Sequence, residues 1–145
     1  MVEIVNGKLV PTRDIDSLPF WQALDAGELR LPHCGACDRF FFPPMPRCVH
    51  CGAAKVEFKP VSGKGTLYSW IVTHHAFHAS FKDELPFTVG VIDLDEGPRL
   101  YARLEGEAAK KPVAGARLAC RIHDYGGFRY PVFASQGNQS ENKSI

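Results

Sequence analysis

The C-terminal half of the chain alternates apolar and polar residues with a period of two, which predicts β-strands. The alternating segments are rich in β-branched and aromatic residues, and turns containing glycine or proline separate most of them. Five strands are expected, at 66–74, 87–94, 99–104, 116–123 and 128–134. A longer connection lies between the third and fourth strands. This spacing fits a partly open Greek-key barrel, the OB-fold, although a small β-sandwich would give a similar pattern.

The first 27 residues are organised differently. Residues 17–27 predict a short helix, because Phe20 and Leu24 share one face at helical spacing and Gly27 can end it. Residues 1–10 predict either a small hairpin or an extended arm, lying on the domain surface or on a partner.

Between the helix and the barrel, two further alternating segments, 28–33 and 56–61, flank a cysteine-rich stretch. Two Cys-x-x-Cys pairs stand ten residues apart, and Gly52 follows the second pair, where a positive φ is often required. Four converging thiolates suit tetrahedral zinc, with Zn–S distances of about 2.3 Å. The pattern predicts a zinc ribbon. The predicted metal ligands are Cys34, Cys37, Cys48 and Cys51.

Four cysteines at this spacing could also form disulfides, act in redox chemistry or bind iron. Two disulfides would need an oxidising compartment, and nothing upstream resembles a signal peptide. A redox enzyme needs a single Cys-x-x-Cys pair, whereas iron on the same four sulfurs is compatible with the spacing. His33 and His50 flank the pairs, but four thiolates already fill a tetrahedral shell. The metal is therefore expected to be structural, since a closed shell leaves no position for substrate.

Length and charge limit the class of protein. A chain of 145 residues with a formal charge of +1 suits one domain, or a small metal module joined to a compact one. The near-neutral charge argues against a general nucleic-acid binder, and no apolar run is long enough to cross a bilayer. Free thiols with metal spacing favour the cytoplasm. We expect an arm and helix at 1–27, a ribbon at 28–61, an OB-fold at 62–135 and a loose tail at 136–145.

No nucleophile–base set emerges: there is no Gly-x-Ser-x-Gly elbow, and Cys120 lies in a strand pattern as a small core residue.

Two segments carry aromatic and cationic side chains that a small domain can hardly bury completely. One of them, the 74–86 loop, has three histidines that invite a metal site, yet no fourth ligand has suitable spacing. The two segments instead indicate a contact surface. Its predicted residues are Arg39, Phe40 and Phe41 in the ribbon arm, and His74, Phe77, His78, Phe81 and Lys82 in the loop.

These motifs together resemble the zinc-ribbon and OB-fold family called domain of unknown function 35. The resemblance covers roughly residues 17–135, in the family's order, and is far more specific than the cysteines alone. It rests on residues 20–29, 31–37, 42–44, 48–52, 62–70 and 131–133.

The resemblance implies a mainly β fold with an N-terminal helix, a rubredoxin-like zinc ribbon and a five-stranded C-terminal OB-fold. It also implies a non-catalytic subunit that associates with thiolases, acetyltransferases or aldolases acting on acyl-CoA, helps to form the acyl-CoA channel and has no activity alone. Other members join hydratases. The alternative is a single-stranded nucleic-acid binder, because OB-folds also serve that purpose; the lack of a Lys/Arg stripe counts against it.

Overall fold

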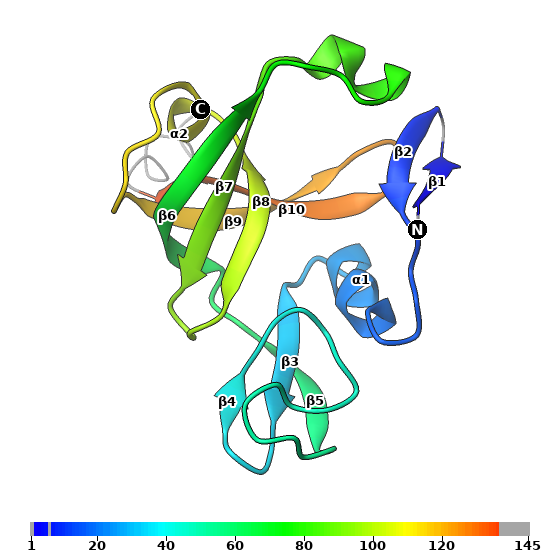
Figure 1. The fold of residues 1–145 in the computed structure, drawn as a ribbon, viewed down its shortest axis with the longest axis vertical. Coiled ribbons are helices and arrows are strands. Elements are labelled where there is room, and N and C mark those ends of the chain that lie inside the picture. The colour runs from blue at the N-terminus through cyan, green and yellow to red at the C-terminus, as the bar shows by residue number, and fades with distance from the viewer. Residues whose placement is uncertain (1, 6, 137–145) are drawn as a thin grey trace.

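The computed structural model describes residues 2–5 and 7–136, which form a barrel, a ribbon and a helix at their junction (Figure 1). The predicted tail from 136 onward lies outside the described residues, except for Gln136. No helix in the described ranges is both long and apolar enough to cross a membrane. The N-terminal and ribbon elements are β1 (Val2–Val5), β2 (Lys8–Pro11), α1 (Leu18–Asp25), β3 (Arg30–Cys34), β4 (Arg39–Phe40) and β5 (Val56–Pro60). The barrel elements are β6 (Lys64–Thr73), η1 (Ala79–Glu84), β7 (Phe87–Leu94), β8 (Arg99–Leu104), α2 (Glu107–Lys110), β9 (Arg117–Asp124) and β10 (Arg129–Ser135).

The five predicted C-terminal strands are confirmed, and they close into a barrel in the order β10-β8-β7-β6-β9. All neighbouring pairs are antiparallel except β10 with β8. The alternation on β7 is strict, so every second residue faces the core. Gly90 leaves room there for Leu104, because an added Cβ would lie 2.8 Å from Leu104 Cδ2 and that side chain would have to shift. The closed barrel confirms the OB-fold architecture.

The ribbon is a three-stranded antiparallel sheet in the order β4-β3-β5. Its central strand β3 is buried over 31–34, because β4 and β5 flank it and its residues Leu31 and Cys34 pack into the main core and the ribbon core. A small separate core contains Cys34, Phe41 and Cys48. This core is too small to hold the ribbon by itself, so the metal site is expected to supply the missing stability.

The helix α1 joins the two modules into one body. Phe20 and Leu24 are buried in the same cluster as Leu29 and Leu31 of the ribbon side and the inward residues of the barrel. The predicted helical face is therefore a core face. After α1 the chain turns at Gly27, whose φ of +87° favours glycine.

The N-terminal segment forms the hairpin β1–β2, which settles the two alternatives left open by the sequence. The hairpin lies against η1 in the 74–86 loop (Figure 1). Lys8 Nζ donates to the carbonyl oxygen of Ser80 at 3.3 Å, and the backbone N–H of Leu9 donates to Ser80 Oγ at 3.3 Å. The first strand pair thus helps to position a loop some 70 residues further along.

Candidate metal centre and the surrounding surface

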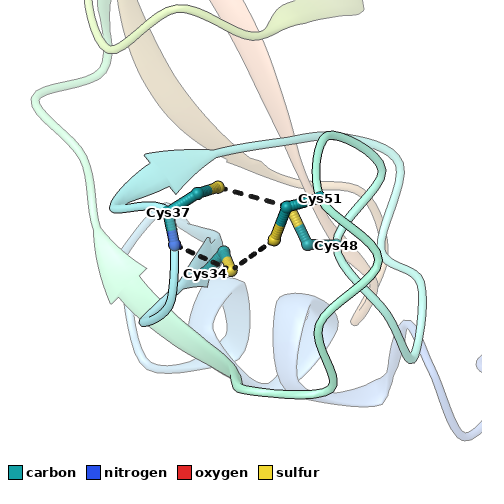
Figure 2. A group of neighbouring side chains, drawn as sticks. All are labelled: Cys34, Cys37, Cys48 and Cys51. Atoms are coloured by element: carbon teal, nitrogen blue, oxygen red, sulfur yellow. Dashed lines mark hydrogen bonds between the residues drawn. The ribbon is translucent and has the colours of Figure 1, made fainter.

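The four cysteine sulfurs meet at one end of the ribbon, pointing toward one another (Figure 2). All four lie within 4.8 Å of one another. Cys34 Sγ is 3.6 Å from Cys51 Sγ, and Cys37 Sγ is 3.7 Å from Cys48 Sγ. A regular tetrahedron with Zn–S bonds of about 2.3 Å requires sulfurs about 3.8 Å apart. The cysteines are unbridged thiols, so the tetrad fits a tetrahedral metal and not a pair of disulfides.

The first knuckle is built by backbone amides that turn back onto a sulfur. The N–H groups of Ala36 and Cys37 point at Cys34 Sγ, at 3.3 and 3.4 Å. The turn closes when the N–H of Asp38 donates to the Cys34 carbonyl at 2.8 Å. Asp38 has a φ of +60°, a conformation that aspartate tolerates better than most residues.

The second knuckle repeats this arrangement. The N–H of His50 points at Cys48 Sγ at 3.2 Å, and the N–H of Gly52 donates to the Cys48 carbonyl at 2.9 Å. Gly52 has a φ of +79°, as its place after the second pair predicted. Two equivalent knuckles face each other, which is how a ribbon holds four ligands on two short turns.

The knuckle amides also set the acidity of the thiols. The N–H of Cys37 is the main cause that lowers the pKa of Cys34. Burial opposes ionisation of Cys48, but the N–H groups of Cys51 and His50 outweigh it and lower its pKa to about 6. Burial raises the pKa of Cys37 to about 12. One thiol in each knuckle therefore ionises readily, and a metal must displace protons from the others.

The two histidines beside the cysteines are not part of the tetrad. His33 Nε2 lies 2.9 Å from Asp38 Oδ1, and His50 Nε2 lies 3.3 Å from the Phe40 carbonyl oxygen. Both contacts brace the ribbon around the metal site. The four sulfurs complete a tetrahedral shell without either ring.

The ribbon-arm residues of the predicted contact surface are divided by the structure. Arg39 is exposed and Phe40 is half-buried, and both line a 350 Å³ hollow that reaches Arg99 of the barrel. Phe41 is only 1% exposed, so its place in the predicted contact surface is wrong. Its ring packs in the ribbon core with Cys34 and Cys48, whereas its neighbours Phe40 and Phe42 are half-buried against the main core cluster.

The loop residues of that predicted surface also differ from one another. Phe77 is 87% exposed, and His74 and Lys82, which precede and follow it in the chain, are exposed as well. His78 is half-buried, and its Nδ1 accepts from the N–H of Ser80 at 3.1 Å, which caps η1. Phe81 turns toward the barrel and lines a larger hollow.

This larger hollow, called here the aromatic hollow, has a volume of 840 Å³ and lies where α1, the ribbon and the barrel meet. The lining residues with polar side-chain atoms are Trp21, Arg99, Tyr101, Arg103 and Tyr130. Phe81 is the only one of the predicted contact residues that lines the hollow. Its aromatic lining residues are Phe20, Trp21, Phe42, Phe81, Phe87, Tyr101 and Tyr130.

Next to the aromatic hollow, the outer face of the barrel carries large uncovered side chains. Tyr68, Ile71 and Tyr101 are 57%, 64% and 72% exposed. Strand pairing places Ile71 opposite Val89 and places Val91 opposite Tyr101, so these side chains share one face of β6, β7 and β8. We call Tyr68, Ile71, Val89, Val91 and Tyr101 the outer barrel face. The sequence signal for it was Tyr101, an aromatic residue at an outward-facing position of β8 between the charged outward residues Arg99 and Arg103.

A half-buried carboxylate, Glu84, holds Arg103 in the wall of the aromatic hollow. Glu84, at the end of η1, accepts from Arg103 at 2.5 Å, from Lys8 at 3.1 Å and from the hydroxyl of Tyr125. Burial raises the pKa of Glu84, but the three donors outweigh it and lower the pKa below the ordinary 4.5. The carboxylate thus ties the N-terminal hairpin, the loop and two barrel segments together.

Replacement of Glu84 by glutamine is expected to destabilise the fold by about 1–3 kcal/mol at neutral pH, because the donors lose a charged acceptor. The folded-state pKa is depressed, so this stabilisation is present above pH 4.5 and is lost as the pH falls through the folded-state value. Urea unfolding of both proteins across pH 3–7 measures the difference. Asp83→Asn, at the exposed neighbouring position, should show little change. A gap between wild type and E84Q that persists unchanged at low pH would contradict this account.

Cys120 stands apart from the metal centre. It is half-buried on β9, and burial raises the pKa of its thiol to about 12. Its side chain lines a 640 Å³ hollow with Gly63 and Ile122. A thiol that keeps its proton is a poor nucleophile, which agrees with the prediction of a packing role.

Comparison with known proteins agrees with the architecture. Family models match the chain as "ChsH2, rubredoxin-like zinc ribbon domain" over residues 21–57 and as "ChsH2, C-terminal OB-fold domain" over residues 58–124. A "probable enoyl-CoA hydratase alpha subunit" from Thermomonospora curvata is 36% identical over 105 residues, or 72% of this chain. The chain spans only 32% of that relative's length.

Two further matches are informative. The "benzoylsuccinyl-CoA thiolase subunit BbsA" from Thauera aromatica is 34% identical over 73 residues, covering 50% of this chain and 49% of the relative. A solved structure described as "Ltp2-ChsH2(DUF35) aldolase" superposes with a TM-score of 0.77 at 31% identity, covering 86% of this chain and 98% of that one. The two domain matches and this structural match together show that the chain belongs to the zinc-ribbon and OB-fold family called domain of unknown function 35 (DUF35).

Proposed function

We propose that this chain is a non-catalytic subunit that docks onto a thiolase-superfamily enzyme acting on acyl-CoA in the cytoplasm and helps to form its acyl-CoA channel. The observation that carries the proposal is the outer barrel face, where Tyr68, Ile71 and Tyr101 are left exposed beside the aromatic hollow. The relatives support the type of partner, since they are named as subunits of a hydratase and a thiolase, and the solved structure as an aldolase.

The metal centre supports a role without chemistry. Four sulfurs complete a tetrahedral shell, so a metal held there has no open position for substrate or water. Zinc would brace the ribbon and fix the arm that carries Arg39 and Phe40. The fifth cysteine keeps its proton and offers no alternative nucleophile.

The outer barrel face has the composition of a protein interface. Tyrosine and arginine are enriched at binding hot spots, and here Arg99 lies over the Tyr68 ring at 3.8 Å. Ile71 and Tyr101 extend the same surface. Exposed apolar patches of this kind on small domains mark interaction sites.

The charge pattern favours an enzyme partner over single-stranded nucleic acid. Arginines on the barrel are paired: Arg99 with Asp93 at 2.6 Å, Arg117 with Asp95 at 2.8 Å, and Arg121 with Glu105 at 3.4 Å. A phosphate-binding groove needs free cations along its length. Acyl-CoA would instead be guided by the retained contact residues. These are Arg39, Phe40, His74, Phe77, His78, Phe81 and Lys82.

Serine substitution of Ile71 and Tyr101 together is expected to abolish co-purification of the large subunit, because truncated hot-spot residues commonly cost 2 kcal/mol or more each. The tagged chain, expressed in its own organism, is purified and its partners are identified by mass spectrometry. Val113→Ser, at a position 60% exposed in the connection before β9, is the matched control.

Three results would decide against the proposal. These are recovery of no thiolase-superfamily or hydratase enzyme with the wild-type chain, equal recovery with the double variant, and thioester turnover by the purified chain alone.

A further inference from the structure

The aromatic hollow is lined by residues from the helix, the ribbon and the barrel. Trp21 comes from α1, Phe42 follows β4 of the ribbon, Phe81 comes from η1, and Phe87 and Tyr101 come from the barrel. Its 840 Å³ lies within the roughly 300–1,000 Å³ of small-molecule sites. An occupant would touch all three modules at once.

The walls of the aromatic hollow are rings set at angles to one another. The Phe20 and Phe42 rings lie 5.4 Å apart with planes inclined by 57°, and the Phe81 and Phe87 rings lie 6.1 Å apart at 44°. Such walls present ring faces, which can stack on a flat or fused ring, and ring edges, which can contact it in a T-shaped arrangement. A thin alkyl chain would leave most of that surface uncovered.

The two arginines at the rim do not make the aromatic hollow a phosphate site. Arg103 is paired with Glu84 at 2.5 Å and lies over the Phe87 ring at 4.0 Å. Arg99 is paired with Asp93 at 2.6 Å. Each guanidinium is already neutralised by a carboxylate, so the nucleotide end of a coenzyme A thioester gains little here. The aromatic lining and the paired arginines therefore favour binding of the apolar acyl end of the thioester.

We infer that the aromatic hollow binds the ring-bearing acyl group of a thioester substrate. The inference rests on the proposed function for the thioester, and on the lining of the hollow for the ring. The rings of the ribbon, α1 and the barrel would enclose the acyl group, and the coenzyme would extend past the outer barrel face, which shares Val89 and Tyr101 with the hollow. A ring-bearing ligand would thus meet this subunit beside its docking surface.

Isothermal titration of the zinc-loaded chain with three probes tests the inference. The probes are 2-naphthoyl-CoA, undecanoyl-CoA of matching carbon count, and free coenzyme A. Naphthoyl-CoA is expected to bind at least about threefold more tightly than undecanoyl-CoA, because ring stacking adds to area burial. Free coenzyme A should give no saturable heat.

Val89→Trp supplies the location test, because Val89 lines the hollow and a larger side chain there would fill it. Val113→Trp, at an exposed position in the connection before β9 and outside both the hollow and the outer barrel face, is the matched control and should bind naphthoyl-CoA normally. Both variants are first checked for zinc content and thermal unfolding.

No binding of naphthoyl-CoA at millimolar concentration, equal binding of undecanoyl-CoA or free coenzyme A, or unchanged binding by a folded V89W protein would each overturn the inference. Because no partner enzyme is present, such a failure is separate from failure of the docking proposal.

Discussion

Replacement of Cys48 by alanine is expected to abolish tight zinc binding and to unfold the ribbon. Structural zinc in finger-like peptides contributes about 10–16 kcal/mol of apparent binding free energy near neutral pH. The buried residues of the ribbon core are Cys34, Phe41 and Cys48, and only small or partly buried side chains pack against them, so apolar packing contributes little to holding the two knuckles together. Hydrogen exchange should show rapid exchange across 30–60 in the variant, and metal analysis should show no stoichiometric zinc.

Cys120→Ala is the matched control, because Cys120 is the one cysteine outside the tetrad. It should retain zinc and ribbon protection. The barrel strands should lose some protection in the Cys48 variant as well, since Leu29 and Leu31 pack into the same cluster as the barrel core. Full ribbon protection in metal-free C48A protein would show that apolar packing alone holds the ribbon.

Lowering the pH should also release the metal from the wild-type protein and unfold the ribbon. Each ligand must be ionised to bind, and Cys48, with a pKa of about 6, is among the last to be protonated as the pH falls. Protons therefore compete with zinc increasingly below neutral pH, and zinc affinity rises with pH. Release measured with a colorimetric chelator should speed up as the pH is lowered, with ribbon unfolding following it.

The metal centre and the barrel were predictable because their determinants are local. A Cys-x-x-Cys pair fixes its own turn through amides that point at Cys34 and Cys48, whatever surrounds it. Likewise, strands 87–94 and 99–104 alternate strictly, so their inward faces follow from the pleat. Only the closure of the barrel required the structure.

The surfaces were harder to predict because tertiary contacts decide them. In the run Phe40-Phe41-Phe42 the sequence offers three equivalent rings, but only packing buries Phe41 and turns Phe42 toward the aromatic hollow. The tie between Lys8 and Glu84 joins residues 76 positions apart, for which the sequence has no local signal. The outer barrel face depends on strand register, which places Ile71 opposite Val89.

Replacement of Phe41 by alanine is expected to destabilise the protein by about 3–5 kcal/mol, the usual cost of emptying a fully buried phenylalanine site. The ring is 1% exposed and packs in the core that contains Cys34 and Cys48. Its loss would also loosen the two knuckles, so zinc affinity should fall together with the unfolding temperature. Chemical denaturation and competitive zinc titration measure the two effects.

Phe77→Ala is the matched control, the same substitution at a ring that is 87% exposed. It should change stability by less than about 0.5 kcal/mol, because little apolar area is lost to water. The pair separates two roles for aromatic residues in this chain. If F41A kept wild-type stability and zinc affinity but failed to recover the large subunit, Phe41 would be a contact residue, as the sequence suggested. A protein that loses stability and zinc together, while F77A loses neither, would instead place Phe41 in the structural support of the metal centre.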